Sequence, residues 1–176
     1  MNIVTQQKGF TVVEVLVAAA IFSFIFLAIL SFIFWLNVTN LKTKADSNTL
    51  ENARRILDTI AYEIRGAESV YTPTTSSTQL SLETGRYLPA GETSTYIDFF
   101  LCGTPAVDIC LKKESQNPIM LNASNVSVTN LSFSQIANGQ NPSIKITITV
   151  ANDNPTNETS NSSSTTLQST VALRNY

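Results

Sequence analysis

The stretch from Phe10 to Leu36, FTVVEVLVAAAIFSFIFLAILSFIFWL, decides the fold of this chain. Its only polar residues are Thr11, Glu14, Ser23 and Ser31, and it contains neither glycine nor proline. A continuous helix of this length runs about 40 Å, at about 1.5 Å per residue. The hydrocarbon core of a bilayer is about 30 Å thick. The stretch therefore predicts a helix that spans a membrane.

Glu14 is the one ionisable residue inside this apolar stretch. A charge at the centre of a membrane costs about 2.5–3.5 kcal/mol on insertion scales. Near a helix start the cost is smaller, because the positive end of the helix dipole favours an acid there. Two interpretations follow. Glu14 is either an acid tolerated at the membrane interface or one that has a cationic partner.

The residues before the stretch, MNIVTQQKG, form a short polar leader that ends in Gly9. A secretory signal peptide places its cleavage site after the apolar run. Here the small residue at the polar-to-apolar boundary stands before the run. The junction KG-FTVVEVLVA closely resembles the class III signal of type IV prepilins and pseudopilins.

That resemblance implies a specific processing step and a specific assembly. A membrane prepilin peptidase would cleave after Gly9 and N-methylate Phe10. Glu14, the fifth residue of the mature chain, would pair with the terminal amine of a neighbouring subunit. The chain would cross the cytoplasmic (inner) membrane once, with its C-terminal domain outside the cytoplasm. Its partners would be the peptidase, the lipid bilayer, an inner-membrane assembly platform, and other pilins or pseudopilins in a filament or tip complex.

The helix is expected to continue beyond Leu36, because no helix breaker occurs before Gly66. One apolar face is predicted from residues at three-, four- and eight-residue steps: Leu41, Ala45, Ala53, Leu57, Ile60 and Ile64. The charged residues between them, Glu63 included, are interpreted as a solvated face. With Gly66 as its C-cap, the helix would be about 55 residues long.

From Ser69 onward the helical period gives way to short alternating runs typical of strands. Strands are expected within 79–83, 95–101, 109–113, 119–121, 125–136 and 143–150, and a closing strand near the C-terminus. The predicted fold is α+β and pilin-like, a long N-terminal helix packed on an antiparallel sheet. Its expected parts are a leader (1–9), a transmembrane and assembly helix (10–36), an amphipathic continuation (37–66) and an extracytoplasmic β-sheet domain (67–176).

The C-terminal half carries a second resemblance. YEIRGAES at the helix end is followed by YIDFF, MLNASNVSVTNLSFSQ, an alternating strand, a polar loop and a terminal TVALRN. This order is similar to that of minor pilins and J-type minor pseudopilins, whose chains often end in a strand followed by Leu-Arg-Asn. The resemblance implies a minor subunit that initiates or caps a type IV pilus or a type II secretion pseudopilus.

Cys102 and Cys110 flank a turn that contains Gly103 and Pro105. If the domain faces an oxidising compartment, a disulfide across this hairpin is expected. Such a bond is worth about 2–3 kcal/mol in the chain-entropy model. Two free thiols are the alternative. A zinc site is not expected, because zinc needs more ligands than this pair provides.

Composition argues against several function classes. The chain has no histidine, so it can form neither a Ser-His-Asp nor a Cys-His catalytic arrangement. Its net charge of −2 gives no electrostatic basis for binding nucleic acid. No cofactor or metal is expected, and the chain is interpreted as a structural protein and not as an enzyme. The competing interpretation is a monomeric, membrane-anchored binding or adhesion domain that never assembles.

Overall fold

The computed structural model describes residues 9, 11–88, 90–136, 142–153 and 162–174. Its one long helix, α1, extends over Val12–Gly66 without interruption. The chain divides into two compact units, Met1–Leu41 and Lys42–Tyr176, so α1 contributes to both. The first unit consists of the apolar part of α1, and the second contains the remainder of α1 and all the strands.

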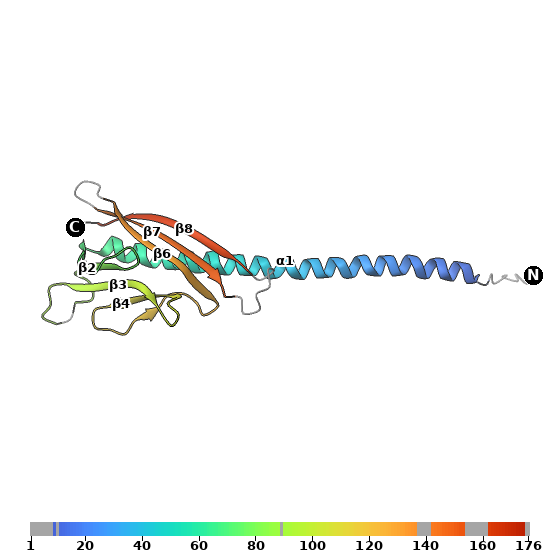
Figure 1. Cartoon of the computed structure of the whole chain (residues 1–176), viewed down its shortest axis with the longest axis horizontal. Coiled ribbons are helices and arrows are strands. Elements are labelled where there is room, and N and C mark those ends of the chain that lie inside the picture. Colours follow the sequence, from blue (N-terminus) through green and yellow to red (C-terminus); the bar gives the residue numbers. More distant parts are fainter. Residues whose placement is uncertain (1–8, 10, 89, 137–141, 154–161, 175–176) are drawn as a thin grey trace, which may run out of the picture. The chain divides into compact units, whose positions relative to one another are not determined.

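The strands form two antiparallel sheets (Figure 1). The five-stranded sheet has the order β1-β2-β3-β4-β5, with the bounds Ser69–Val70, Leu80–Thr84, Thr95–Cys102, Asp108–Lys113 and Ile119–Met120. The three-stranded sheet has the order β6-β7-β8, with the bounds Val126–Ile136, Ser143–Asn152 and Ser164–Ala172. Neighbouring strands are therefore consecutive in the chain, and each sheet is built from simple hairpin connections.

The core of the second unit lies between α1 and the inner faces of both sheets. From α1 it takes a face that repeats every three or four residues, which is the helical period. From the sheets it takes alternate residues, as the pleat requires. The central side chains are fully buried, among them Ile56, Ile60, Phe99, Ile146 and Ile148. Packing against two sheets explains why this part of α1 is stable as a helix.

Polar contacts tie α1 to the connection between β5 and β6. Arg55 Nη2 donates to Leu121 O at 2.8 Å and to Asn52 Oδ1 at 3.0 Å. Asn52 Oδ1 also accepts from Ala123 N at 3.1 Å. The buried Asn122 amide accepts from Ile109 N at 2.9 Å and donates to Val126 O at 2.9 Å. These bonds satisfy backbone groups that would otherwise be buried without partners.

The structure confirms the predicted fold class and corrects four details. It has two sheets where one was expected, and it adds the two-residue strand β1, which the sequence pattern did not reveal. Leu41 was placed on the core face of the helix, but it is 47% exposed. Glu63 was placed on the solvated face, but it is only 4% exposed. Leu41 is exposed because the rest of the domain begins to cover α1 only from Ala45.

Candidate functional site

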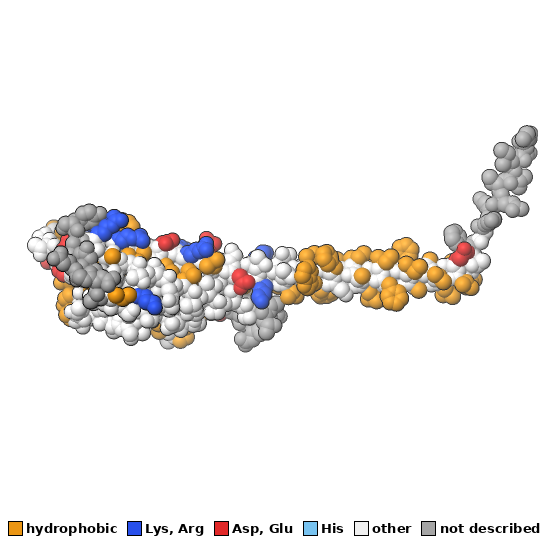
Figure 2. All heavy atoms as spheres, turned by 90° about the horizontal axis from the view of Figure 1, so that it is seen from above, with side chains coloured by type: hydrophobic (Ala, Val, Ile, Leu, Met, Phe, Trp, Pro, Cys, Tyr) orange, Lys and Arg blue, Asp and Glu red, His pale blue; other side chains and the backbone are white. Residues whose placement is uncertain are grey.

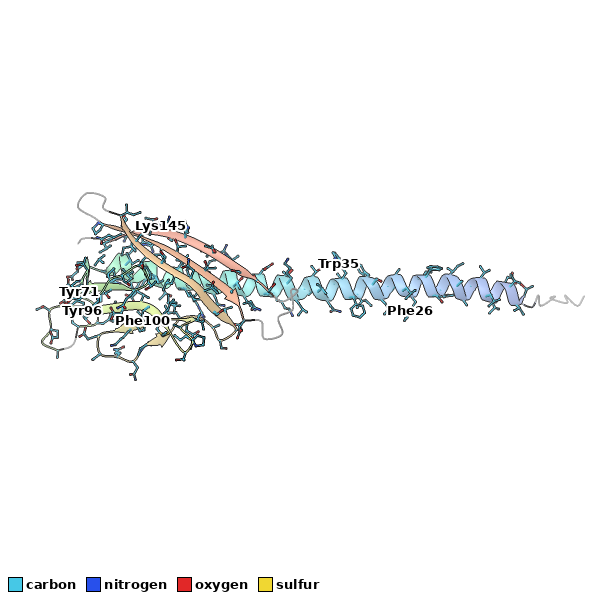
Figure 3. The ribbon with its side chains drawn as sticks, viewed as in Figure 1. Phe26, Trp35, Tyr71, Tyr96, Phe100 and Lys145 are labelled. Atoms are coloured by element: carbon cyan, nitrogen blue, oxygen red, sulfur yellow. A yellow bond between two sulfur atoms is a disulfide. The ribbon has the colours of Figure 1, made fainter. Side chains whose placement is uncertain are left out.

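The first part of α1 exposes large apolar side chains on all sides. Every residue from Val12 to Lys44 is exposed within the chain, and hydrophobic atoms cover this part of the helix in Figure 2. Phe26 and Trp35 project from opposite sides of the helix (Figure 3). By length and composition this helix can cross a membrane. A helix that is apolar all round is suited to a lipid or protein environment and not to water.

Hydroxyl groups in this part of α1 bond to the helix itself. Ser23 Oγ donates to Ala19 O at 2.8 Å, and Thr39 Oγ1 donates to Trp35 O at 2.9 Å. Bonding to a carbonyl one turn earlier satisfies a hydroxyl without help from water. These two polar side chains are therefore compatible with a non-aqueous environment.

Thr11 and Glu14 form a reciprocal cap at the start of α1. Glu14 Oε2 accepts from Thr11 N at 3.0 Å and from Thr11 Oγ1 at 3.1 Å. In return, Thr11 Oγ1 accepts from Glu14 N at 3.3 Å. This is the capping-box arrangement, in which a threonine and an acid three residues later satisfy each other's backbone donors. The cap gives Glu14 a local role at the helix start. Its predicted pairing with a neighbour's amine involves a second chain and stays a prediction.

Gly9 lies two residues before Thr11, the first residue of this cap. A Cβ atom added to Gly9 would have no heavy atom within 4 Å, so the fold of the chain itself places no demand for glycine here. A requirement for glycine at this position would therefore come from recognition by another protein. The rest of the predicted leader and Phe10 lie outside the described residues.

An ion pair between the buried Glu63 and the half-buried Lys113 joins α1 to the five-stranded sheet. Lys113 Nζ on β4 lies 3.1 Å from Glu63 Oε1 and 3.7 Å from the centre of the Tyr87 ring. Burial of Lys113 would lower its pKa, but the contacts with Tyr87 and Glu63 outweigh that effect and raise the pKa. Glu63 Oε2 is buried without a hydrogen-bond partner among the residues that the structure describes. Tyr87 Oη also donates to Glu63 Oε1, at 3.5 Å. The carboxylate therefore depends on Lys113 for its counter-charge, with a long hydrogen bond from Tyr87 beside it.

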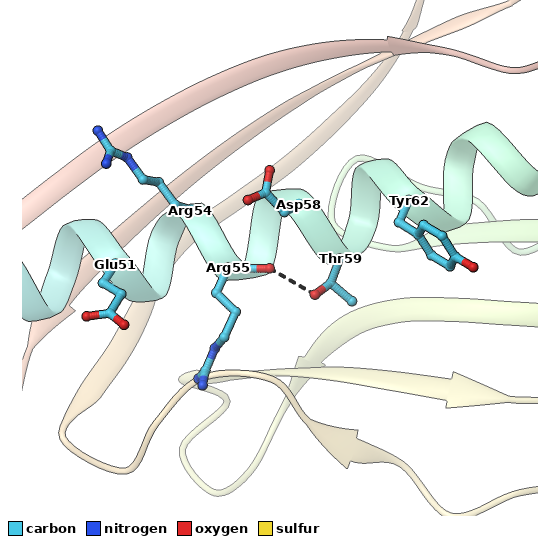
Figure 4. A pocket seen from close by; sticks show the side chains of 6 residues that line it. All are labelled: Glu51, Arg54, Arg55, Asp58, Thr59 and Tyr62. Carbon is cyan, nitrogen blue, oxygen red and sulfur yellow. Dashed lines mark hydrogen bonds between the residues drawn. The ribbon is translucent and has the colours of Figure 1, made fainter.

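An open groove of about 570 Å³ follows the exposed side of the second part of α1 (Figure 4). Its walls come from successive turns of one helix, with charges of both signs: Glu51, Arg54, Arg55, Asp58, Thr59 and Tyr62. Thr59 Oγ1 is bonded to Arg55 O at 2.8 Å. The groove is open, so it does not exclude water from a ligand. Its lining residues also include no nucleophile next to a base. Within the described residues there is also no group of three His, Cys, Asp or Glu side chains suited to a metal.

Cys102 and Cys110 are joined by a disulfide, with their Cα atoms 5.9 Å apart. The bond links the end of β3 to β4, across the hairpin whose turn contains Gly103 at φ 90°. The predicted site residues thus fall in two separate places. Glu14 and Gly9 lie at the start of α1, whereas the disulfide stabilises the five-stranded sheet.

Sequence reasoning missed the Glu63–Lys113–Tyr87 cluster. The signal that could have found it is positional. Glu63 stands one residue before Ile64 and three after Ile60, both fully buried, so it lies beside the apolar face. Its partner is 50 positions away on β4, and no local pattern pairs the two.

Comparison with known proteins gives a match at the N-terminal end of the chain. Residues 5–30 fit the family model of the prokaryotic N-terminal methylation motif. No curated protein and no solved structure matches the chain. The motif is of the prepilin type, and it supports a type IV pilin-like role for the chain. It also implies processing by a prepilin peptidase and assembly with other pilins. Together with the apolar helix, it fits a protein anchored in the inner membrane, and proteins of this type are structural and not enzymatic.

Proposed function

We propose that this chain is a minor pilin or pseudopilin that initiates or caps a type IV pilus or a type II secretion pseudopilus. The observation that carries the proposal is the juxtaposition of two features. A prepilin-type methylation motif covers residues 5–30, and α1 then exposes apolar side chains on every side as far as Val38. Such a helix can be a membrane anchor before assembly and can pack with other helices after it.

The proposed processing divides the chain at Gly9. Residues 1–9 are removed, and Phe10 becomes the methylated first residue. Residues 10–36 are the transmembrane and assembly helix, 37–66 its amphipathic continuation, and 67–176 the extracytoplasmic domain. In this scheme Glu14 serves twice. It caps its own helix through Thr11, and it then accepts the terminal amine of a neighbouring subunit as the helices come together.

Three features support a minor subunit over the repeating body of a fibre. The C-terminal TVALRN resembles the ends of J-type minor subunits. Many major pilins carry a proline near the position of Ser31, whereas α1 continues through Ser31 as a helix. A polar loop within 152–165 would also be difficult to repeat around a packed shaft, although its residues 154–161 lie outside the described ones.

Quantitative mass spectrometry of sheared filaments, combined with a deletion strain, tests the proposal. We expect the chain to be scarce in the fibre while its loss sharply reduces the number of fibres. If it is instead the most abundant fibre component, the minor role is wrong. If the chain is absent from fibres that form normally without it, it is an anchored binding domain that does not assemble.

A further inference from the structure

The four outer strands of the two sheets differ in how well their edges are protected. Edge strands expose unpaired backbone groups, and proteins usually shield them by making them short, bulged, charged or covered. In the five-stranded sheet the outer strands β1 and β5 have only two residues each. In the three-stranded sheet β6 has a bulge between Val128 and Asn130. Three of the four edges are therefore protected in recognised ways.

The edge of β6 is also covered by hydrogen bonds from outside its sheet. Val128 N donates to Val107 O at 2.7 Å, and Phe133 N donates to Ser77 O at 2.8 Å. These bonds use donors that point away from β7. Among the residues that the structure describes, the remaining edge, that of β8, has none of these devices. Its nine residues, STTLQSTVA, include no charge, proline or glycine, and it pairs with β7 without a bulge.

Hydrogen bonds at the two ends of the β7–β8 ladder show which backbone groups of β8 point outward. Asn152 N donates to Ser163 O at 2.8 Å, and Leu173 N donates to Pro142 O at 3.2 Å. In an antiparallel ladder, hydrogen-bonded pairs recur at every second residue. By the observed register, Leu167 opposite Ile148 is such a pair. The residues that point their N–H and C=O away from β7 are consequently Ser164, Thr166, Gln168, Thr170 and Ala172.

These outward groups are accessible. All five residues are exposed, and in the part of the chain that the structure describes nothing is hydrogen-bonded to their backbone. Their neighbours Thr165, Leu167 and Ser169 face the helix side of the sheet, yet each is only half-buried. The three-stranded sheet thus ends before its inner face is fully covered.

We propose that the free edge of β8 binds an extended segment of a partner protein, which adds a fourth strand to the β6-β7-β8 sheet. In such β-augmentation the backbone supplies the affinity, and alternate side chains supply the specificity. The incoming strand would place aliphatic residues beside Leu167 and small hydroxyl or amide residues beside Thr166 and Thr170. It needs no charge, because β8 offers none.

A second copy of this chain is a less suitable occupant than a different protein. β8 begins beside α1, where Thr165 Oγ1 lies 3.0 Å from Thr49 Oγ1, and runs toward the C-terminal end of α1 (Figure 1). Helix and strand therefore share a general direction. An antiparallel pair of two β8 strands would set residues 42–66 of the two helices in opposite directions. Two copies that point the same way could pair only through parallel strands, which are slightly less stable per residue.

The test uses the full-length chain in detergent and a fluorescein-labelled peptide, SIKITITV, which is the sequence of residues 143–150 and already pairs with β8 on its inner side. We expect saturable binding by fluorescence polarisation. The double variant Thr166→Pro/Thr170→Pro removes two outward backbone donors and leaves the backbone bonds between β7 and β8 in place. It also loses the bond between Thr166 Oγ1 and Thr149 Oγ1, 2.9 Å apart, and so does the valine control below. It should bind at least about tenfold more weakly. The matched variant Thr166→Val/Thr170→Val keeps both donors and should bind within about twofold of the wild type.

Hydrogen exchange of the wild-type chain provides a readout that needs no variant. The amides of Thr166, Gln168 and Thr170 should exchange fast in the free chain and slowly with the peptide bound. Absence of saturable binding, or unchanged binding by the proline variant, would contradict the proposal. If the valine variant lost as much peptide affinity as the proline variant, the peptide would be recognising the Thr166 and Thr170 side chains and not the backbone of β8. Protection of these amides in a dimer of the chain alone would make the occupant a second copy and would overturn the proposal as stated.

Discussion

The two parts of α1 belong to one continuous helix, yet they differ in whether their apolar side chains are exposed or buried. From Val12 to Val38 the large apolar side chains are exposed. From Ala45 to Ile64 most apolar side chains are buried against two sheets, and most charged ones face outward. The second part is therefore stabilised inside the chain, whereas the first must be stabilised by something outside it. The methylation motif at the start of this helix indicates what surrounds its first part. We infer that lipid surrounds it before assembly and that helices of other subunits surround it afterwards.

Each part of α1 also holds one acid in a special position. Glu14 is bonded to Thr11 at the exposed start of the helix. Glu63 is buried and paired with Lys113 of β4. If the comparison is right, removing the partner of Glu63 destabilises the folded domain, whereas removing the Glu14 carboxylate impairs assembly and leaves the domain's stability unchanged. Trp35, the one tryptophan, reports on the first part, while all five tyrosines lie in the second unit. The two can thus be followed separately.

The largest effect is expected from Lys113→Met. This change leaves the buried Glu63 carboxylate without its cation, and breaking a buried pair from one side costs about 3–5 kcal/mol. Denaturant unfolding followed by the near-ultraviolet circular dichroism of the tyrosines should show that loss. The double variant Glu63→Leu/Lys113→Met should recover most of it, because no buried charge then remains.

The same ion pair makes the free energy of unfolding depend on pH in the alkaline range. The folded-state pKa of Lys113 is raised, so its contribution to stability is complete at neutral pH and below. That contribution is lost as the pH rises through the folded pKa, above the ordinary lysine value of about 10.4. The double variant should lack this component of the alkaline loss. An equal alkaline loss in wild type and double variant would contradict the assignment.

Two isoleucine-to-alanine changes compare the parts of α1 directly. Ile60 is fully buried, whereas Ile25 is 51% exposed within the chain. Ile60→Ala should lower the free energy of unfolding of the domain by about 2–5 kcal/mol, the usual cost of such a cavity. Ile25→Ala should leave domain unfolding unchanged. A comparable loss in both variants would mean that the first part of α1 also folds against the domain.

A somewhat smaller effect is expected at the disulfide. Cys102→Ser/Cys110→Ser should cost about 2–3 kcal/mol, because the closed loop is short. The loss should appear in the tyrosine signal and leave the fluorescence of Trp35 in detergent unchanged. Thiol alkylation of exported protein without reductant should label neither cysteine. Ready labelling of both would show that packing alone holds the hairpin.

The smallest effect on stability is expected from Glu14→Ala. Loss of the cap should cost the helix start about 1 kcal/mol and leave unfolding of the domain unchanged. The variant should still be processed and inserted in the membrane, but it should enter filaments poorly, and Glu14→Asp should retain part of that ability. Mass spectrometry of sheared filaments provides the measurement. Normal incorporation of the alanine variant would make Glu14 an acid that is merely tolerated at the interface.

The sequence predicted those features that depend on local pattern. The helix was expected to be about 55 residues long with Gly66 at its end, and α1 covers Val12–Gly66. The alternation at Ile144, Ile146 and Ile148 predicted β7 and its buried face. The hairpin between Cys102 and Cys110 was recognisable because its glycine and proline signal a turn within a few residues.

Features that depend on distant contacts could not be read in this way. β1 has two residues and exists only because Ser69 and Val70 pair with β2. Nothing local separates β1–β5 from β6–β8 into different sheets. Glu63 was assigned to the solvated face because its partner lies on β4, and only the folded sheet brings Lys113 to it. The free edge of β8 is likewise a property of the sheet order.

The most direct test of the account is the intact mass of the chain purified from native membranes. We predict a single species that begins at N-methyl-Phe10 and lacks residues 1–9, and we predict that Gly9→Val blocks this cleavage. The valine has open space around it in the chain, so a block would reflect the peptidase and not misfolding. A full-length wild-type chain, or one cleaved after Leu36, would contradict the assignment of α1 as an anchor and assembly helix of the pilin type.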